Sequence, residues 1–172
     1  MYKDNNLYLI GPPAAGKTSI GRELARVLGL EFYDSDIEVE KKAGADITWI
    51  FDIEGEEGFR ARERKVIDEL TKLRGILLAT GGGAIVDDQN RDRLSATGTV
   101  IYLSVGVEAQ VARTEKDKKR PILQGAVDKR EVLTEILLER EHLYEQIADV
   151  TVITDKRSVR SVVQEIIDKL EK

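Results

Sequence analysis

The stretch LYLIGPPAAGKTSIG, residues 7–21, decides the fold. A short apolar run at 7–10 ends in glycine, and GPPAAGKT at 11–18 fits the phosphate-binding-loop pattern GxxxxGK[ST] in full. Apolar residues at helical spacing then continue until Gly29. A strand, this loop and a helix, in this order, direct consecutive backbone N–H groups at an anionic phosphate. The stretch therefore predicts nucleotide binding in an α/β fold.

Two adjacent prolines make this loop unusual. Pro12 and Pro13 have no N–H group, so neither contributes a donor to a phosphate. The amides after them still form a full nest, and we expect the loop to work. Lys17 is expected to place its charge on the outer phosphates, and the Thr18 hydroxyl to ligate Mg²⁺. The expected backbone donors are Ala14, Ala15, Gly16, Lys17, Thr18 and Ser19.

Composition limits the chemistry and the partners. The 172 residues include no cysteine and one histidine, which excludes disulfides, thiolate metal sites and a multi-histidine metal site. A net charge of -5 argues against a nucleic-acid partner. Because neither a membrane-spanning run nor a secretory signal is apparent, we expect a cytoplasmic protein that does not enter a membrane. The length favours one domain over 1–172, and we expect a monomer.

Strand and helix signals alternate along the chain, which predicts a parallel sheet covered by helices on both faces. The expected strands are 7–10, 30–34, 76–80, 99–105 and 149–154, and further helices are expected at about 34–43, 47–54, 56–74, 87–95, 107–113, 128–148 and 158–171. Two excursions interrupt the alternation. Residues 34–74 place several helices between strands, and the basic segment at 114–127 is either a lid or a disordered surface loop.

The second expected strand ends in FYDSD, which supplies two carboxylates beside the loop. Asp34 is the better candidate for the Mg²⁺ shell. Asp36 would orient or deprotonate an acceptor hydroxyl. The alternative is that one of the two only caps the helix expected to begin near residue 37.

Arginines and glycines suggest where the acceptor binds. In GEEGFRARE, residues 55–63, Arg60 lies on a predicted helix, although pairing with a nearby glutamate is the alternative. The triple glycine at 81–83 costs backbone entropy, which is justified where amides approach a polar ligand closely.

The chain resembles shikimate kinase from Leu7 to about Leu170. The resemblance is carried by GPPAAGKTSIGRELA, YDSD, GEEGFRARE, ATGGGA, RPIL and LLEREHLYEQIAD, in this order. It implies a three-layer fold of the nucleoside-monophosphate-kinase type with sheet order 2-3-1-4-5, a helical substrate-binding subdomain and a lid. It also implies ATP-dependent phosphorylation of the 3-hydroxyl of shikimate, in the pathway to chorismate and the aromatic amino acids.

The resemblance assigns roles residue by residue. Lys17, Asp36 and Arg120 are the catalytic residues it implies, with Arg120 as the lid arginine on the transferring phosphate. Thr18 and Asp34 would hold the metal. Arg113 would lie beside the adenine, and Arg157 matches the adenine-side segment loosely. The shikimate site it implies comprises Asp36, Arg60, Gly81, Gly82, Gly83 and Arg140, with Phe51 and Phe59 as apolar walls.

One departure and two rival functions accompany this resemblance. The family usually has glycine where this chain has Ala14, and alanine is strained if the position needs a positive φ. The nearest rival is a kinase for gluconate or a nucleoside monophosphate, in which Trp49 or the two phenylalanines would stack a base. The other is a non-catalytic, nucleotide-dependent binding protein. His142 is expected at the surface or behind the site.

Overall fold

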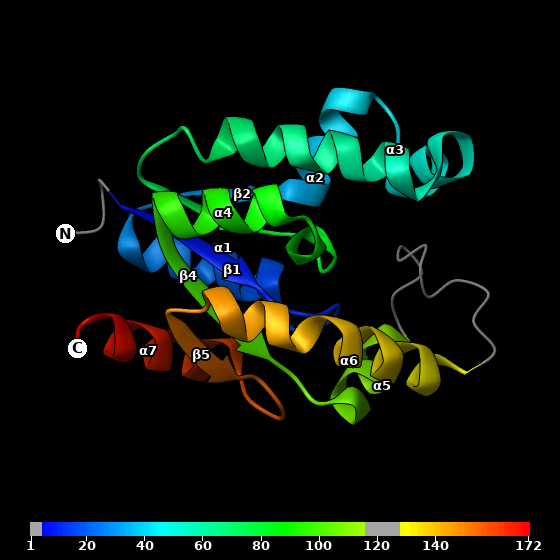
Figure 1. The fold of residues 1–172 in the computed structure, drawn as a ribbon. Coiled ribbons are helices and arrows are strands. Elements are labelled where there is room, and N and C mark those ends of the chain that lie inside the picture. Colours follow the sequence, from blue (N-terminus) through cyan, green and yellow to red (C-terminus); the bar gives the residue numbers. More distant parts are fainter. Residues whose placement is uncertain (1–4, 116–127) are drawn as a thin grey trace.

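A computed structural model describes residues 5–115 and 128–172 of the chain (Figure 1). Its strands form one parallel sheet in the order β2-β3-β1-β4-β5, which confirms the predicted order. The strands are β1 Asn6–Ile10, β2 Glu31–Asp34, β3 Ile76–Ala79, β4 Gly98–Ser104 and β5 Val150–Ile153. The helices are α1 Lys17–Leu28, α2 Ser35–Ala43, α3 Ile47–Leu70, α4 Asp88–Thr97, α5 Val107–Thr114, α6 Lys129–Ile147 and α7 Val159–Leu170, with a short 3₁₀ turn, η1, at Ala84–Val86.

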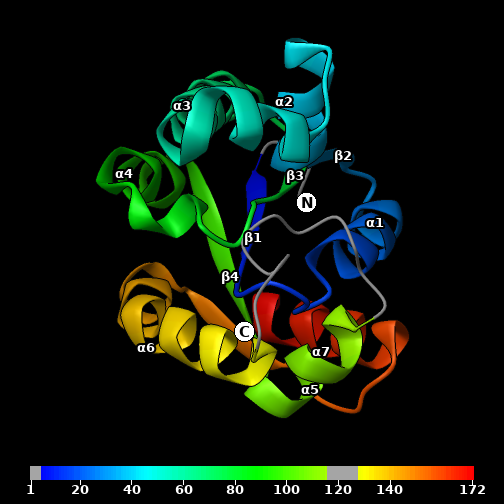
Figure 2. The ribbon, with the colours of Figure 1, turned by 90° about the vertical axis from the view of Figure 1, so that its right-hand side faces the viewer.

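The sheet separates two apolar cores because side chains alternate between its faces. On one face Tyr8 and Ile10 of β1 pack against residues of α3, α4 and α6. On the other face Leu7 and Leu9 pack against α1 and α7. Figure 2 shows these helices on opposite sides of the sheet. The predicted three-layer arrangement is confirmed.

The strand register brings three loops to one edge of the sheet. Leu9 of β1 and Asp34 of β2 both lie opposite Ala79 of β3. The phosphate-binding loop, the acidic turn and the triple glycine start immediately beyond these positions. Because the strands are parallel, their carboxyl ends meet at this edge, where sheets of this class bind ligands.

The helical excursion differs in detail from the prediction. The expected break between helices falls at Gly55, whose φ of 73° and ψ of 178° interrupt α3. Helix α3 ends at Leu70 rather than near residue 74. At this end the Thr71 hydroxyl donates to the carbonyl oxygen of Ile67. The turn η1 was not predicted, because three residues are too short for a periodic signal.

Candidate active site

The phosphate-binding loop leaves the start of α1 open to an anion. Gly16 has a φ of 89° and precedes the helix, where no side chain caps the first turn and no acidic residue lies within it. The Lys17 ammonium bonds the carbonyl oxygens of Gly11 and Pro12 at 2.7 and 2.9 Å. Helix N-terminal amides with an adjacent lysine form an anion site. This end of α1 can therefore receive phosphate.

Ala14 does adopt the strained conformation, with a φ of 66°. Side chains of α5 hold the carbonyl groups of the two peptide bonds that flank Ala14. Gln110 donates to the oxygen of Pro13 at 2.9 Å, and Arg113 donates to the oxygen of Ala14 at 2.7 Å. Ala15 N–H donates to Pro12 at 3.3 Å, so one expected phosphate donor also has a partner within the loop. Gln110 was missed because a single polar residue on a helix carries no motif.

Asp34 uses its two oxygens for different purposes. Its Oδ1 accepts from the backbone N–H groups of Asp36 and Ile37, so Asp34 is the N-cap of α2, which begins at Ser35. Its Oδ2 accepts from the Thr18 hydroxyl at 2.7 Å. The capping alternative and the proximity to Thr18 therefore hold together. In residues 5–115 and 128–172 no three His, Cys, Asp or Glu side chains group as metal ligands.

Side chains crowd each residue of the triple glycine. A Cβ on Gly81 would lie 2.6 Å from Asp36 Oδ1 and 2.9 Å from Glu63 Oε2. One on Gly82 would lie 3.0 Å from Pro13 of the phosphate-binding loop, and one on Gly83 would overlap the Arg60 guanidinium. A side chain at Gly81 or Gly83 would therefore displace Asp36, Glu63 or Arg60 from its observed position. The loop brings the predicted acceptor residues next to the phosphate-binding loop.

Arg60 pairs with the carboxylate of Glu63, one of the nearby glutamates in its motif. Its Nη1 bonds Glu63 Oε1 at 2.9 Å, and its guanidinium lies over the Phe59 ring. Phe51 and Phe59 contact each other with ring centroids 5.0 Å apart. Glu63 is fully buried, and burial raises its pKa to about 7, opposed chiefly by Arg60. Its position three residues after Arg60 on α3 was the available signal.

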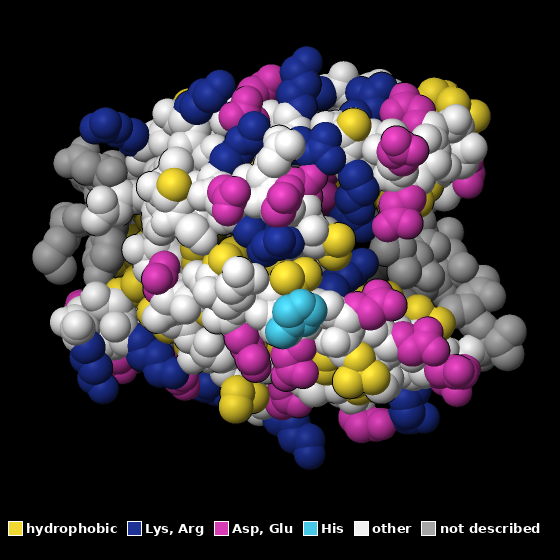
Figure 3. Space-filling view, viewed as in Figure 1, with side chains coloured by type: hydrophobic (Ala, Val, Ile, Leu, Met, Phe, Trp, Pro, Cys, Tyr) yellow, Lys and Arg dark blue, Asp and Glu magenta, His cyan; other side chains and the backbone are white. Residues whose placement is uncertain are grey.

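Arg140 of α6 is the predicted residue with the most informative surroundings. Its side chain is buried, yet its Nε and Nη1 atoms have no hydrogen-bond partner in the described part of the chain. It interacts electrostatically with Glu63. Burying a charge with unbonded N–H groups is costly, so such a group points to a missing anionic partner. Between α4 and α6, Figure 3 shows basic side chains together with hydrophobic ones.

Other predicted residues lie elsewhere. Arg157 bonds Ser161 and Glu165 and so turns toward α7. Trp49 is 51% exposed, and His142 lies on the surface of α6 (cyan in Figure 3). Arg120 and residues 116–127 of the expected lid lie outside the described residues.

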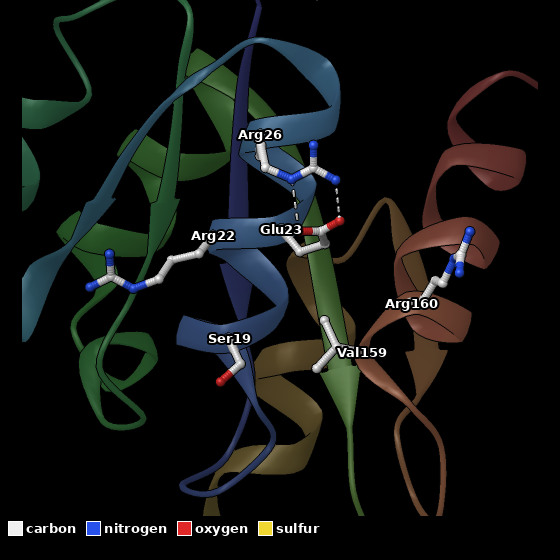
Figure 4. A pocket seen from close by; sticks show the side chains of 6 residues that line it. All are labelled: Ser19, Arg22, Glu23, Arg26, Val159 and Arg160. Atoms are coloured by element: carbon white, nitrogen blue, oxygen red, sulfur yellow. Dashed lines mark hydrogen bonds and ion pairs between the residues drawn. The ribbon is translucent and has the colours of Figure 1, made fainter.

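A separate open hollow lies between α1 and α7, lined by Ser19, Arg22, Glu23, Arg26, Val159 and Arg160 (Figure 4). Arg26 is paired with Glu23, and Arg22 points away from α7 toward the Phe32 ring. The lining of this hollow includes none of the residues expected to bind the phosphate acceptor.

The fold, together with the site around the phosphate-binding loop and the triple glycine, defines a small-molecule kinase of the phosphate-loop class. A family model described as shikimate kinase matches residues 13–171. The chain belongs to the shikimate kinase family, as its motifs predicted. Distant structures such as a deoxyadenosine kinase from M. mycoides, at 15% identity and a TM-score of 0.65, share the fold alone.

Individual relatives agree along the full length. A shikimate kinase from Histophilus somni is 54% identical, covering 99% of this chain and 98% of its own. Shikimate kinase 1 from Enterobacter is 56% identical with 99% coverage of both chains. The solved shikimate kinase from Acinetobacter baumannii, in complex with shikimate, has a TM-score of 0.96 at 46% identity, covering 99% of this chain and 94% of that one. The predicted kinase activity is confirmed at the level of the family.

Proposed function

We propose that this kinase transfers the terminal phosphoryl group of ATP to the 3-hydroxyl of shikimate. The buried Arg140 guanidinium carries this proposal, because a substrate carboxylate would supply the partner that its N–H groups lack. Arg60 brings a second planar cation to the glycine loop. Two guanidinium groups suit a small acceptor with one carboxylate.

Asp36 would orient the acceptor hydroxyl and accept its proton. Its carboxylate lies against Gly81 and interacts with buried Glu63. In the same glycine loop, Gly82 packs on Pro13 of the phosphate-binding loop and Gly83 lies against Arg60. A carboxylate within reach of a hydroxyl is the usual base or orienting group in phosphoryl transfer.

The donor side would be served by the phosphate-binding loop and Mg²⁺. Lys17 and the α1 amides would neutralise phosphate charge, which is the main catalytic need in this reaction. Thr18 and Asp34 offer neighbouring oxygens, 2.7 Å apart, of the kind that Mg²⁺ prefers. Bound Mg²⁺ would neutralise charge on the ATP phosphates. The roles of Arg113 beside the adenine and of Arg120 at the transferring phosphate stay predictions.

We also propose a single kinase domain over 1–172 that acts as a cytoplasmic monomer. No helix among the described residues is long and apolar enough to cross a membrane. Size-exclusion chromatography with light scattering tests the oligomeric state, and a dimer mass at working concentration would contradict it.

A coupled ADP-release assay over shikimate, gluconate and nucleoside monophosphates tests the activity. We expect ADP release with shikimate and with none of the other acceptors. Asp36→Asn and Arg60→Ala should each abolish useful turnover while ATP still binds. Arg62→Ala is the matched control, since Arg62 is on the same helix but pairs with Glu54 in solvent. Normal shikimate turnover in the first two variants, or a preference for another acceptor, contradicts the proposal.

A further inference from the structure

Tyr144 of α6 is a buried residue that the sequence motifs did not single out. Its side chain is 1% exposed, and its hydroxyl donates to the carbonyl oxygen of Gly82 at 2.6 Å. Its ring stacks on Tyr102 of β4, with centroids 5.0 Å apart and planes 17° apart. Burial raises the pKa of the Tyr144 hydroxyl, so it stays protonated and remains a donor.

The other two carbonyls of the triple glycine are held by the loop itself. Gly81 O accepts from the N–H of Ala84 at 3.1 Å, and Gly83 O accepts from the N–H of Val86 at 3.2 Å. These bonds belong to the turn that leads into η1. They leave the central carbonyl, of the partly buried Gly82, without a partner from the loop's own backbone.

The bond from Tyr144 completes this set and fixes one peptide plane. In a trans peptide the C=O and the following N–H point in opposite directions. Anchoring Gly82 O to α6 therefore turns the Gly83 N–H away from α6. Among the described residues no hydrogen-bond partner is found for this N–H, which leaves it available to a ligand. Gly83 itself lies against the Arg60 guanidinium.

Gly82 also touches the donor side of the site. Its Cα packs so closely on Pro13 of the phosphate-binding loop that an added Cβ would lie 3.0 Å from the proline ring. Arg140 lies one helical turn before Tyr144 and interacts with its hydroxyl. A displacement of Gly82 would therefore change the conformation of the triple glycine next to Arg140.

We propose that Tyr144 is a positioning residue that holds the glycine loop in the orientation required by the acceptor. The inference rests on the proposed function for its kinetic consequence. Its structural content is that one hydroxyl on α6 sets the Gly82–Gly83 peptide plane. Tyr144 acts through this loop rather than on the reacting atoms.

Tyr144→Phe tests the proposal, because phenylalanine keeps the ring stack and removes only the hydroxyl. Loss of the hydrogen bond to the Gly82 carbonyl should raise the KM for shikimate about fivefold or more. The KM for ATP should change less than about twofold, because Gln110 and Arg113 of α5 hold the Pro13 and Ala14 carbonyls of the phosphate-binding loop. Tyr33→Phe is the matched control, since the Tyr33 hydroxyl bonds Glu31 at the surface and its loss should change neither constant.

Amide hydrogen exchange at residues 82–84 gives a readout that does not depend on activity. Exchange at the Ala84 amide, which donates to the Gly81 carbonyl, should be faster in Tyr144→Phe than in Tyr33→Phe. Unchanged exchange, an unchanged shikimate KM in an active enzyme, or equal increases in both KM values would overturn the proposal. If the unmodified protein does not phosphorylate shikimate, the proposed function fails, and the exchange result still decides whether Tyr144 anchors the loop.

Discussion

Arg113 of α5 donates to the carbonyl oxygen of Ala14 at 2.7 Å, while its second Nη donates to the carbonyl oxygen of Thr154 at 2.9 Å. The same side chain thus joins the phosphate-binding loop to the segment after β5. The loop residue that it holds has a φ of 66°. Left-handed backbone costs a non-glycine residue roughly 1–2 kcal/mol, so contacts outside the loop maintain its conformation.

Ala14→Gly should increase the free energy of unfolding by up to about 1 kcal/mol. Glycine removes the left-handed strain, and its greater freedom in the unfolded chain offsets part of the gain. Chemical denaturation measures the change. Ala25→Gly, buried inside α1, is the control and should lower stability by about 1 kcal/mol or more, because the glycine also leaves a small cavity. A loss of stability in Ala14→Gly would show that the positive φ is not the source of strain.

Gln110→Met should raise the KM for ATP about fivefold and leave the KM for shikimate unchanged. The substitution removes the 2.9 Å bond to the Pro13 carbonyl, which is worth about 1 kcal/mol, and with it one support of the loop. Steady-state kinetics with each substrate varied in turn measures both constants. Gln164→Met, on the exposed side of α7, provides the control. Equal effects on both substrates would contradict a role confined to the donor side.

Sequence patterns predicted the fold well because each strand is a short apolar run followed by a distinct turn. The order of strands came from the family resemblance, since no local pattern records which strands pair. The break at Gly55 was predictable because glycine marks a helix interruption. The end of α3 was not, because bonds at Thr71 set it and no proline follows.

Candidate site residues could be predicted where they belong to a sequence motif. They could not be predicted where their role depends on burial or on contacts in the fold. Arg60 and the triple glycine stand in motifs, and the structure brings them together. Gln110 and Tyr144 reach the loops of the candidate site through hydrogen bonds to residues far away in sequence, and Glu63 owes its raised pKa to burial. A pattern in one sequence does not record either quantity.

Arg140→Met should leave the protein as stable as before, or more stable by about 1 kcal/mol, while raising the KM for shikimate about 30-fold or more. Stability is retained because methionine fills similar volume and removes a buried charge with unbonded N–H groups, which offsets the lost interactions of Arg140 with Glu63 and the Tyr144 hydroxyl. Binding is lost because removing one member of a buried charge pair costs about 2 kcal/mol or more. Thermal unfolding and kinetics measure the two effects.

Arg157→Met is the control for this prediction, because Arg157 pairs with Glu165 beside α7. It should not change the shikimate KM. A large loss of stability in Arg140→Met with an unchanged shikimate KM would make Arg140 a structural residue.

Glu63→Gln should flatten the decline of stability between about pH 4.5 and pH 7. Burial raises the folded pKa of Glu63 to about 7 from 4.5, so the folded protein holds this proton more tightly than the unfolded chain. The unfolded chain therefore loses the proton first as the pH rises. Stability falls through this window, by about 3 kcal/mol in total, and the loss is complete above the folded pKa. Glutamine carries no proton to lose.

Urea unfolding of both proteins from pH 4.5 to pH 8 measures this difference. Subtracting the two curves removes groups that titrate alike in both, and a constant effect of breaking the bond to Arg60 offsets the difference without changing its slope with pH. Glu165→Gln is the matched control, because Arg157 and Lys169 lower the pKa of Glu165, and its linkage lies below the window. If the curves for the native protein and Glu63→Gln run parallel, Glu63 does not titrate near pH 7. Its pairing with Arg60 would then be permanent and independent of pH.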